Sequence, residues 1–449
     1  MVLSMAPLRE RGGNSASRRR ELAGALTRAR KKRCAIVSRW HCGNPHYPLL
    51  QHAARRFHKC KSSAKVPSPN FSQLLLTAAL LFATAAFADT AKPAQIATHA
   101  TADVMTSDGP YVHYLPGKRG LEVSWVCKGK TVKQVIANAT DAVIKPACGF
   151  PKPITIRDVS PTLPVPVKFT AKNLIALSDV HGQFDTMVKL LQANGIIDRD
   201  MKWAFGEGHM VMVGDMFDRG PKVTEVLWLL YQLEAEAAAA GGAVHVVLGN
   251  HETMVFYDDL RYIHPKYAAV AKQLNDTYTG LFSEQTVLGR WLRSKPMLLQ
   301  VNDILFVHGG LSPEFAALNM TAQETNEAFR TTLGLPRDTI RATQPAALLY
   351  GARGPIWYRG YFNEPKIDTA SLDKLLSQYA VKRIVVGHTT MSGVFSHYDG
   401  RIISVDTAIQ KGVGGELFFW SEGQLARGTF QGARLPVPEY VKGASTDAH

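Results

Sequence analysis

Side chains that can bind a metal or transfer a proton stand directly after each of five short apolar runs. The first run, 174–177, stops at Asp179 and His181, and the later runs end in VGDMFDRG, LGNHE, FVHGG and VVGHT. Runs of this kind are typical of buried strands in α/β folds, whose carboxyl ends meet in one crevice. These ends bring together the following residues: Asp179, His181, Asp215, Asp218, Arg219, Asn250, His251, Glu252, His308 and His388.

The donor types in this set favour a metal centre. Carboxylate, imidazole and amide oxygen are suitable ligands for Mn²⁺, Fe and Zn²⁺. None of the five cysteines stands in a C-x-x-C spacing, which argues against a cysteine zinc site. Four histidines with several carboxylates are too many for one ion, so we expect two ions that share a bridging carboxylate. Such a pair makes hydroxide available near neutral pH, and the predicted reaction is phosphoester hydrolysis by metal-bound hydroxide.

Two arginines are candidates for holding the phosphate oxygens. Arg219 lies in the second loop, and Arg359 lies in the stretch GPIWYRGY with Arg353 behind it. A planar guanidinium matches phosphate bidentately, although a surface ion pair is the plainer alternative for either residue. No cysteine or serine nucleophile stands out in the series, so we expect direct attack without a phospho-enzyme.

The combination SDVHG, GDMFDRG, GNHE, HGG and GH resembles the phosphoprotein phosphatase family, within the calcineurin-like metallophosphoesterases, over residues 173–410. The stretches SDVHG, GDMFDRG, WYRGY and VDT are similar to those of the bacterial Shewanella-like phosphatases. The resemblance implies an α/β fold in which a β-sandwich is flanked by helices. It also implies two metal ions, held by these residues in this order along the chain: Asp179 and His181 on the first ion, Asp215 as the bridge, and Asn250, His308 and His388 on the second.

The same resemblance implies the remaining roles. His251 is the expected general acid to the leaving oxygen, Asp218 orients it, and Arg219 and Arg359 hold phosphate. A phosphorylated protein is the expected substrate, with tyrosine slightly favoured over serine or threonine, and small phosphoesters are also expected. Two alternatives stay open: a symmetrical diadenosine tetraphosphate hydrolase, and a catalytically inactive metal-binding module.

Departures from the family pattern limit what can be carried over. Ser178 replaces a more usual glycine, Phe217 replaces a valine common in the eukaryotic enzymes, and 405–407 occupies the region of a C-terminal loop that is absent here. We expect Asp406 to support the site or a turn rather than to bind metal.

Strands and helices largely alternate through residues 168–435, which is the predicted catalytic domain. We expect strands at 174–179, 209–214, 244–248, 297–301, 304–307, 383–386 and 402–405, and a final hairpin of 416–420 with 424–430. Helices are expected at 183–196, 223–240, about 321–333 and 370–380, with a helical insertion at 259–295. A further helix starts near His251, with Asn250 as its N-cap unless a metal engages that side chain. Residues 436–449 are a predicted flexible tail.

A small β-rich unit is expected before this domain, at residues 89–150, with strands at 111–114, 121–127 and 130–136. A proline-rich segment, 151–167, follows it as an extended linker or edge segment. Cys127 and Cys148 are a plausible disulfide if the protein is exported, and two buried free thiols are the alternative.

The basic character of the chain belongs to its first part. The net charge is +15, but residues 1–88 hold 16 of the 52 basic residues and two of the 37 acidic ones, so the remainder is close to neutral. We therefore expect no nucleic-acid partner. Residues 1–70 are predicted to be a disordered basic leader.

The stretch 74–88, LLLTAALLFATAAFA, has no charge and ends in Ala86-Phe87-Ala88. This is typical of a secretory signal peptide, which we place at 71–88, and it predicts a periplasmic protein without stable membrane insertion after cleavage. Its internal position suggests that the gene start is set too early, although no Met lies between Met5 and Met105. An uncleaved anchor and a buried helix are the alternatives.

Overall fold

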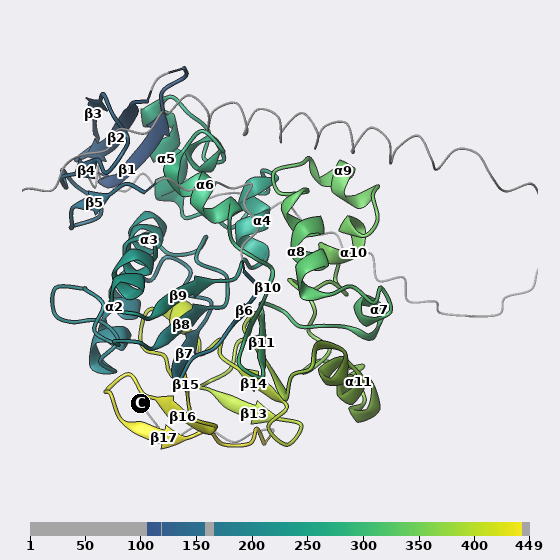
Figure 1. Ribbon diagram of the computed structural model, residues 1–449. Helices are drawn as coiled ribbons and strands as arrows, with labels where there is room; N and C mark the ends of the chain where they lie inside the picture. Colours follow the sequence, from purple (N-terminus) through teal and green to yellow (C-terminus); the bar gives the residue numbers. More distant parts are fainter. Residues whose placement is uncertain (1–105, 118, 158–165, 442–449) are drawn as a thin grey trace, which may run out of the picture. The chain divides into compact units, whose positions relative to one another are not determined.

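Two six-stranded sheets form the body of the protein in the computed structural model, which describes residues 106–117, 119–157 and 166–441 (Figure 1). All of these lie within one unit, 95–449. The leader expected at 1–70, the signal segment at 71–88 and most of the tail lie outside the described residues.

The first sheet has the strand order β17-β16-β15-β7-β8-β9. Its parallel strands are β7 (Asn173–Leu177), β8 (His209–Met212) and β9 (Ala243–Val246). The antiparallel strands β15 (Leu417–Ser421), β16 (Gln424–Gly428) and β17 (Arg434–Pro436) extend it from β7. Three ends that carry predicted site residues therefore lie side by side.

The second sheet has the order β13-β14-β12-β11-β10-β6. Its parallel strands are β11 (Ile304–Val307), β12 (Arg383–Val386) and β14 (Ile402–Ser404). The remaining strands are β6 (Lys168–Phe169), β10 (Leu298–Val301) and β13 (Phe395–His397). The ends of β11, β12 and β14 lead to His308, His388 and Asp406.

Alternate side chains of the strands serve two different cores. Leu174 and Ala176 of β7 pack between the sheets with Ile304 and Phe306 of β11, whereas the intervening residues join the larger core under the helices. Because both faces are buried, these strands are apolar throughout, as the continuous runs in the sequence indicated. The predicted sandwich flanked by helices is confirmed.

Helices cover the outer faces (Figure 1). Helices α2 (Phe184–Ala193), α3 (Val223–Ala239) and α4 (Asn250–Phe256) follow β7, β8 and β9, and α8 (Ala322–Arg330) and α11 (Thr369–Tyr379) lie along the second sheet. Shorter helices are α7 (Pro313–Ala316), α9 (Arg337–Arg341), α10 (Ala346–Leu349) and η2 (Ile409–Lys411). The predicted insertion contains α5 (Pro265–Leu274), η1 (Gly280–Phe282) and α6 (Val287–Arg293).

Two sequence predictions need correction at the strand ends. Strands β7, β8 and β9 each stop two residues before the predicted end, because the chain turns into a loop there, with a positive φ of 55° at Asp179 and of 87° at Gly214. Asn250 is not the N-cap of α4: it is the first helical residue and Gly249 precedes it. The side chain of Asn250 is instead directed at His308.

A three-stranded sheet precedes the sandwich and packs on its helices. Its strands are β1 (Asp108–Tyr114), β2 (Leu121–Cys127) and β3 (Lys130–Ile136), and a small pair, β4 (Val143–Ile144) with β5 (Ile154–Thr155), follows. The indole nitrogen of Trp228 in α3 donates to the Pro110 carbonyl at 2.8 Å, and Lys266 of α5 forms an ion pair with buried Asp108. Among the described residues, no helix is both long and apolar enough to span a membrane.

The disulfide between Cys127 and Cys148 is present, as the sequence suggested, with 5.7 Å between the Cα atoms. It joins the end of β2 to the loop between β4 and β5 across 21 residues. A cross-link of this span restricts the unfolded chain and thereby favours the folded state.

Replacing both cysteines by serine should lower the free energy of unfolding by about 3 kcal/mol, the value typical for a loop of this length. Urea unfolding of residues 89–449 would measure the difference. Reductant should destabilise the native protein and leave the double variant unaffected. Equal unfolding free energies for the two proteins would contradict a stabilising role for this bond.

Candidate metal centre and active site

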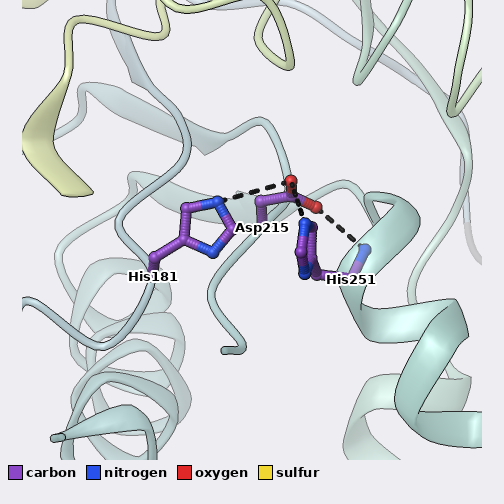
Figure 2. Close-up of side chains that lie close together, drawn as sticks. All are labelled: His181, Asp215 and His251. Carbon is purple, nitrogen blue, oxygen red and sulfur yellow. Dashed lines mark hydrogen bonds and ion pairs between the residues drawn. The ribbon is translucent and has the colours of Figure 1, made fainter. Parts of the chain in front are cut away.

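The Asp215 carboxylate lies at the centre of the site, with three imidazoles around one of its oxygens. Its Oδ2 is 3.2 Å from Nε2 of His308, 3.6 Å from Nε2 of His181 and 3.8 Å from Nε2 of His251. Figure 2 shows His181 and His251 on either side of this carboxylate. Asp215 belongs to two groups of potential metal ligands, one with His181 and His251 and one with His308 and His388.

The other predicted ligands border the same cluster. Oδ1 of Asp179 is 3.8 Å from Nε2 of His181, while its Oδ2 accepts hydrogen bonds from the Ser178 hydroxyl and the His388 backbone. Oδ1 of Asn250 lies 2.9 Å from Nε2 of His308. The structure thus brings together all six predicted ligands, and it adds His251 to the first group. None is more than 5% exposed.

The histidines present the nitrogen that a metal requires. Nδ1 of His181 lies 2.6 Å from the Phe217 carbonyl oxygen, and Nδ1 of His308 lies 2.7 Å from that of Val213. A carbonyl only accepts hydrogen bonds, so each Nδ1 carries a proton, and Nε2 is the nitrogen of each ring that can bind a metal. Nε2 of His181 and of His388 has no hydrogen-bond partner among the described residues. Buried nitrogens without partners are costly, and a bound cation would satisfy them, so the donor set fits a metal.

Burial sets the electrostatics of the cluster. It lowers the pKa of His181 to about 3 and raises the pKa of Asp179 to about 6. Burial by itself would lower the pKa of His308, but the adjoining Asp215 carboxylate outweighs it and raises that pKa to about 10. Carboxylates held this far from water bind a cation strongly, because few water molecules compete with them.

The backbone at the site is held in an uncommon conformation. Asp179, His181, Asp215, Asp218, Arg219 and His388 all have positive φ, between 44° and 71°. Such residues cost free energy and persist only where the surroundings hold them in place. The loops also approach closely: a Cβ at Gly249 would lie 2.3 Å from Oδ1 of Asp215. Only glycine fits that position, and the approach lets β8 and β9 present their end residues to one point.

Glu252 holds the loop that carries Asp215. Its carboxylate is fully buried and accepts hydrogen bonds from four backbone N–H groups: Gly249 at 2.7 Å, Asp215 at 3.0 Å, Met216 at 2.7 Å and Phe217 at 3.2 Å. Hydrogen bonds to a charged acceptor are stronger than neutral ones. The motif GNHE contains Glu252 but does not indicate its role, because four N–H groups pointing at one carboxylate become visible only in the fold.

His251 and Asp218 form a pair beside the metal ligands. Nδ1 of His251 lies 2.5 Å from Oδ2 of Asp218, which leaves Nε2 of His251 directed at the cluster. The ring of Tyr262 lies 5.4 Å from the His251 ring, and Tyr262 is 46% exposed. Tyr262 belongs to the predicted insertion, and the sequence gave no signal that it would reach the site.

The two predicted phosphate-binding arginines differ in their setting. Nη1 of Arg359 donates to the His388 carbonyl at 2.5 Å and to the Thr389 hydroxyl at 3.1 Å, and its charge acts on Asp179 and Asp215. Arg219 is exposed, and its backbone N–H donates to the Tyr262 carbonyl at 2.9 Å. The third arginine, Arg353, lies away from the cluster. Its Nε is 3.5 Å from Oε1 of Glu314, with which it forms an ion pair.

Asp406 is buried behind the site. Its Oδ2 accepts from the Thr390 hydroxyl at 2.7 Å and its Oδ1 accepts from the Ala408 backbone at 3.2 Å. Both oxygens are therefore engaged with neighbouring groups of the chain.

Residues 172–391 match the calcineurin-like phosphoesterase family. A solved structure described as the cold-active protein-tyrosine phosphatase of the psychrophile Shewanella sp. is 39% identical, with a TM-score of 0.69, and the match covers 73% of this chain and 98% of that one. This chain belongs to the calcineurin-like metallophosphoesterases. It is a metal-dependent phosphatase, a hydrolase that acts on phosphoesters.

Curated relatives agree with this family. Shewanella-like protein phosphatase 2 of Arabidopsis thaliana is 27% identical, over 54% of this chain and 72% of the relative. Shewanella-like protein phosphatase 1 of Plasmodium berghei is 25% identical, over 62% and 72% respectively. A symmetrical bis(5'-nucleosyl)-tetraphosphatase of Vibrio cholerae is 31% identical but matches 34% of this chain and 51% of its own length. The Shewanella-like resemblance is thus confirmed, and the nucleotide hydrolase has less support.

Replacing Glu252 by Gln should lower the free energy of unfolding by about 1.5–3 kcal/mol. The substitution removes the negative charge that accepts the four hydrogen bonds, and it places an NH₂ group opposite backbone N–H groups. It should also lower the bound metal content, since the loop of Asp215 loses its anchor. Urea unfolding and elemental analysis would measure the two effects. The same change at exposed Glu207 is the control. Retention of both native stability and native metal content in Glu252→Gln would contradict this positioning role.

Proposed function

We propose that this phosphatase is an exported enzyme that holds two metal ions and hydrolyses phosphoproteins, with phosphotyrosine as the preferred residue. The observation that carries the proposal is the placement of a single Asp215 oxygen among three imidazole nitrogens, next to the His251–Asp218 pair. This combination provides both a metal centre and a proton donor in one buried cluster.

Asp215 would contribute to the binding of both ions. Asp179 and His181 would hold the first ion with it, and Asn250, His308 and His388 would hold the second. Ligands of this type favour Mn²⁺, Fe or Zn²⁺. When bound, such ions polarise the phosphoryl oxygens and lower the pKa of water.

His251 supplies the proton for the leaving group. Hydrolysis adds the oxygen of water to phosphorus and breaks the bond from phosphorus to the leaving oxygen, which then needs a proton. Nε2 of His251 faces the cluster and can donate that proton, while Asp218 on Nδ1 fixes the ring and stabilises its charged form. The proton returns to His251 from solvent after each turnover.

The arginines bind the phosphate oxygens. Arg359 is held by the His388 carbonyl and the Thr389 hydroxyl through Nη1, so its remaining N–H groups are available for a bidentate contact. Arg219 is exposed at the rim of the site. It lies close enough to Arg359 for the charges of the two guanidinium groups to interact. A binding module without activity would not require these groups, nor the His251–Asp218 pair, which argues against that alternative.

Two observations favour phosphotyrosine over phosphoserine or phosphothreonine. The solved relative with 39% identity is described as a protein-tyrosine phosphatase. Half-exposed Tyr262 lies against His251, where its ring can pack on the aromatic ring of a tyrosine substrate. Diadenosine tetraphosphate is the second candidate substrate, and it rests on the weaker match to the Vibrio cholerae enzyme.

The proposed export to the periplasm is supported by the signal-like stretch 71–88 and by the Cys127–Cys148 disulfide, since disulfides persist in oxidising compartments. Amino-terminal sequencing of the exported protein should begin at Asp89. A mature amino terminus well upstream of that residue would contradict the proposed cleavage.

Metal-dependent phosphate release should be greatest with phosphotyrosine peptides when residues 89–449 are tested with Mn²⁺ added or chelated. Phosphoserine and phosphothreonine peptides and diadenosine tetraphosphate complete the panel. Release from the peptides that chelation abolishes is the expected result. Cleavage of the dinucleotide without cleavage of any phosphopeptide would move the assignment to nucleotide hydrolysis.

Replacing His251 by Ala should lower kcat by about 10²–10⁴, the contribution usual for a general acid. The loss should be larger for phenyl phosphate than for p-nitrophenyl phosphate, because the phenolate is the poorer leaving group and depends more on protonation. Steady-state kinetics on both substrates gives the comparison. An equal loss on the two esters would argue that His251 serves the metal centre and not the leaving group.

A further inference from the structure

A cavity of about 560 Å³ adjoins the metal centre. Its aromatic lining consists of Tyr257, Tyr350 and Trp357, and its charged lining consists of Arg337, Arg341 and Arg359. The volume lies in the range of binding sites for small ligands. None of the described residues that line it is acidic.

The cavity and the metal centre share a wall. Arg359 lines the cavity while its Nη1 donates to the carbonyl of His388, and the ring of Trp357 lies 5.5 Å from the His388 ring. A substrate bound at the metal centre can therefore extend past Arg359 into the cavity.

The far side of the cavity is built from helix α9. Arg337 and Arg341 are four residues apart, so their side chains lie on one face of that helix, and Ile340 packs beneath them. Figure 1 shows α9 beside α10 and α8, away from the strands that carry the metal ligands. Most residues that line the cavity thus come from the chain after β11, and Tyr257 comes from the end of α4.

The two arginines of α9 are not equally free. Arg337 lies 3.5 Å from Asp259 and stacks over Tyr257 at 5.6 Å, and Asp259 also pairs with Arg261. Arg341 is exposed, and its side chain has no ion pair or hydrogen bond among the described residues. Asp259 offsets part of the positive charge, which leaves the cavity cationic at Arg341 and Arg359.

We propose that this cavity is an accessory subsite that binds an anionic side chain of the peptide substrate, a carboxylate or a second phosphate, next to the phosphorylated residue. Guanidinium groups bind both anions through paired hydrogen bonds, and the aromatic lining packs against the methylene groups that carry them. This inference rests on the proposed phosphoprotein substrate and extends it to the neighbouring sequence.

The test compares kcat/KM for phosphotyrosine peptides that differ at the positions on either side of the phosphotyrosine. One peptide has neutral neighbours, one has Glu, one has a non-hydrolysable phosphonate in place of the second phosphate, and one has Lys. The native enzyme should prefer an anionic peptide over the neutral one by about tenfold, the effect of one additional charge-assisted contact. The Lys peptide should be the poorest substrate.

Arg341→Glu should abolish this preference, and Arg341→Lys should retain part of it. Because the ratio compares two peptides on the same preparation, a partly unfolded variant does not disturb it. Arg199→Glu, the same charge change at an exposed residue after α2, is the control and should keep the native ratio. If kcat/KM is higher than for the neutral peptide with both the Glu and the phosphonate peptides, the ligand is an acidic residue. If it is higher with the phosphonate peptide alone, the ligand is a second phosphate.

Two results would overturn the subsite. One is equal kcat/KM for the neutral and anionic peptides in the native enzyme while metal-dependent hydrolysis of both persists. The other is an unchanged preference in Arg341→Glu. Neither result would contradict the proposed phosphoprotein activity. That activity would be contradicted if no phosphopeptide were hydrolysed. In that case the proposed subsite would be contradicted as well.

Discussion

The structure depends on keeping several carboxylates and imidazoles together in a place that water hardly reaches. Asp179, Asp215 and His308 are almost wholly buried, and the histidines turn their Nε2 atoms toward one carboxylate oxygen. Such a cluster is unfavourable unless each group has a partner or a cation. Hydrogen bonds with the backbone provide some of these partners. Backbone carbonyls orient the imidazoles, and the Glu252 carboxylate accepts hydrogen bonds from four N–H groups of the loops.

The two sheets provide the rigid frame for this arrangement. Leu174, Val211 and Phe306 pack between the sheets, so the strand ends cannot move independently of one another. That packing opposes the unfavourable φ values at Asp179, Asp215 and His388. Short, stiff connections at the ends of buried strands hold catalytic side chains more firmly than longer loops could.

The residues proposed for chemistry and those proposed for substrate selection come from different parts of the chain. The metal ligands follow parallel strands of both sheets, whereas Tyr262 comes from the insertion after α4, and the arginines of α9 come from the helices after β11. The three-stranded sheet at the start of the described chain packs on α3 and α5, away from the metal ligands. The segments beyond the strand ends can therefore change substrate preference without disturbing the metal cluster.

The sequence by itself predicted the candidate site residues and determined most of the elements, because apolar runs that end in Asp, His or Asn are a local signal. Strand β11, which ends directly before His308, follows from that pattern. Only the tertiary structure decided that the ligands come from two facing sheets, that Asn250 begins α4 and faces His308, and that Glu252 anchors the loop of Asp215. Likewise, Tyr262 and Arg341 carry no local signal, since contacts between residues distant in sequence depend on how the helices pack and not on the pattern of any one segment.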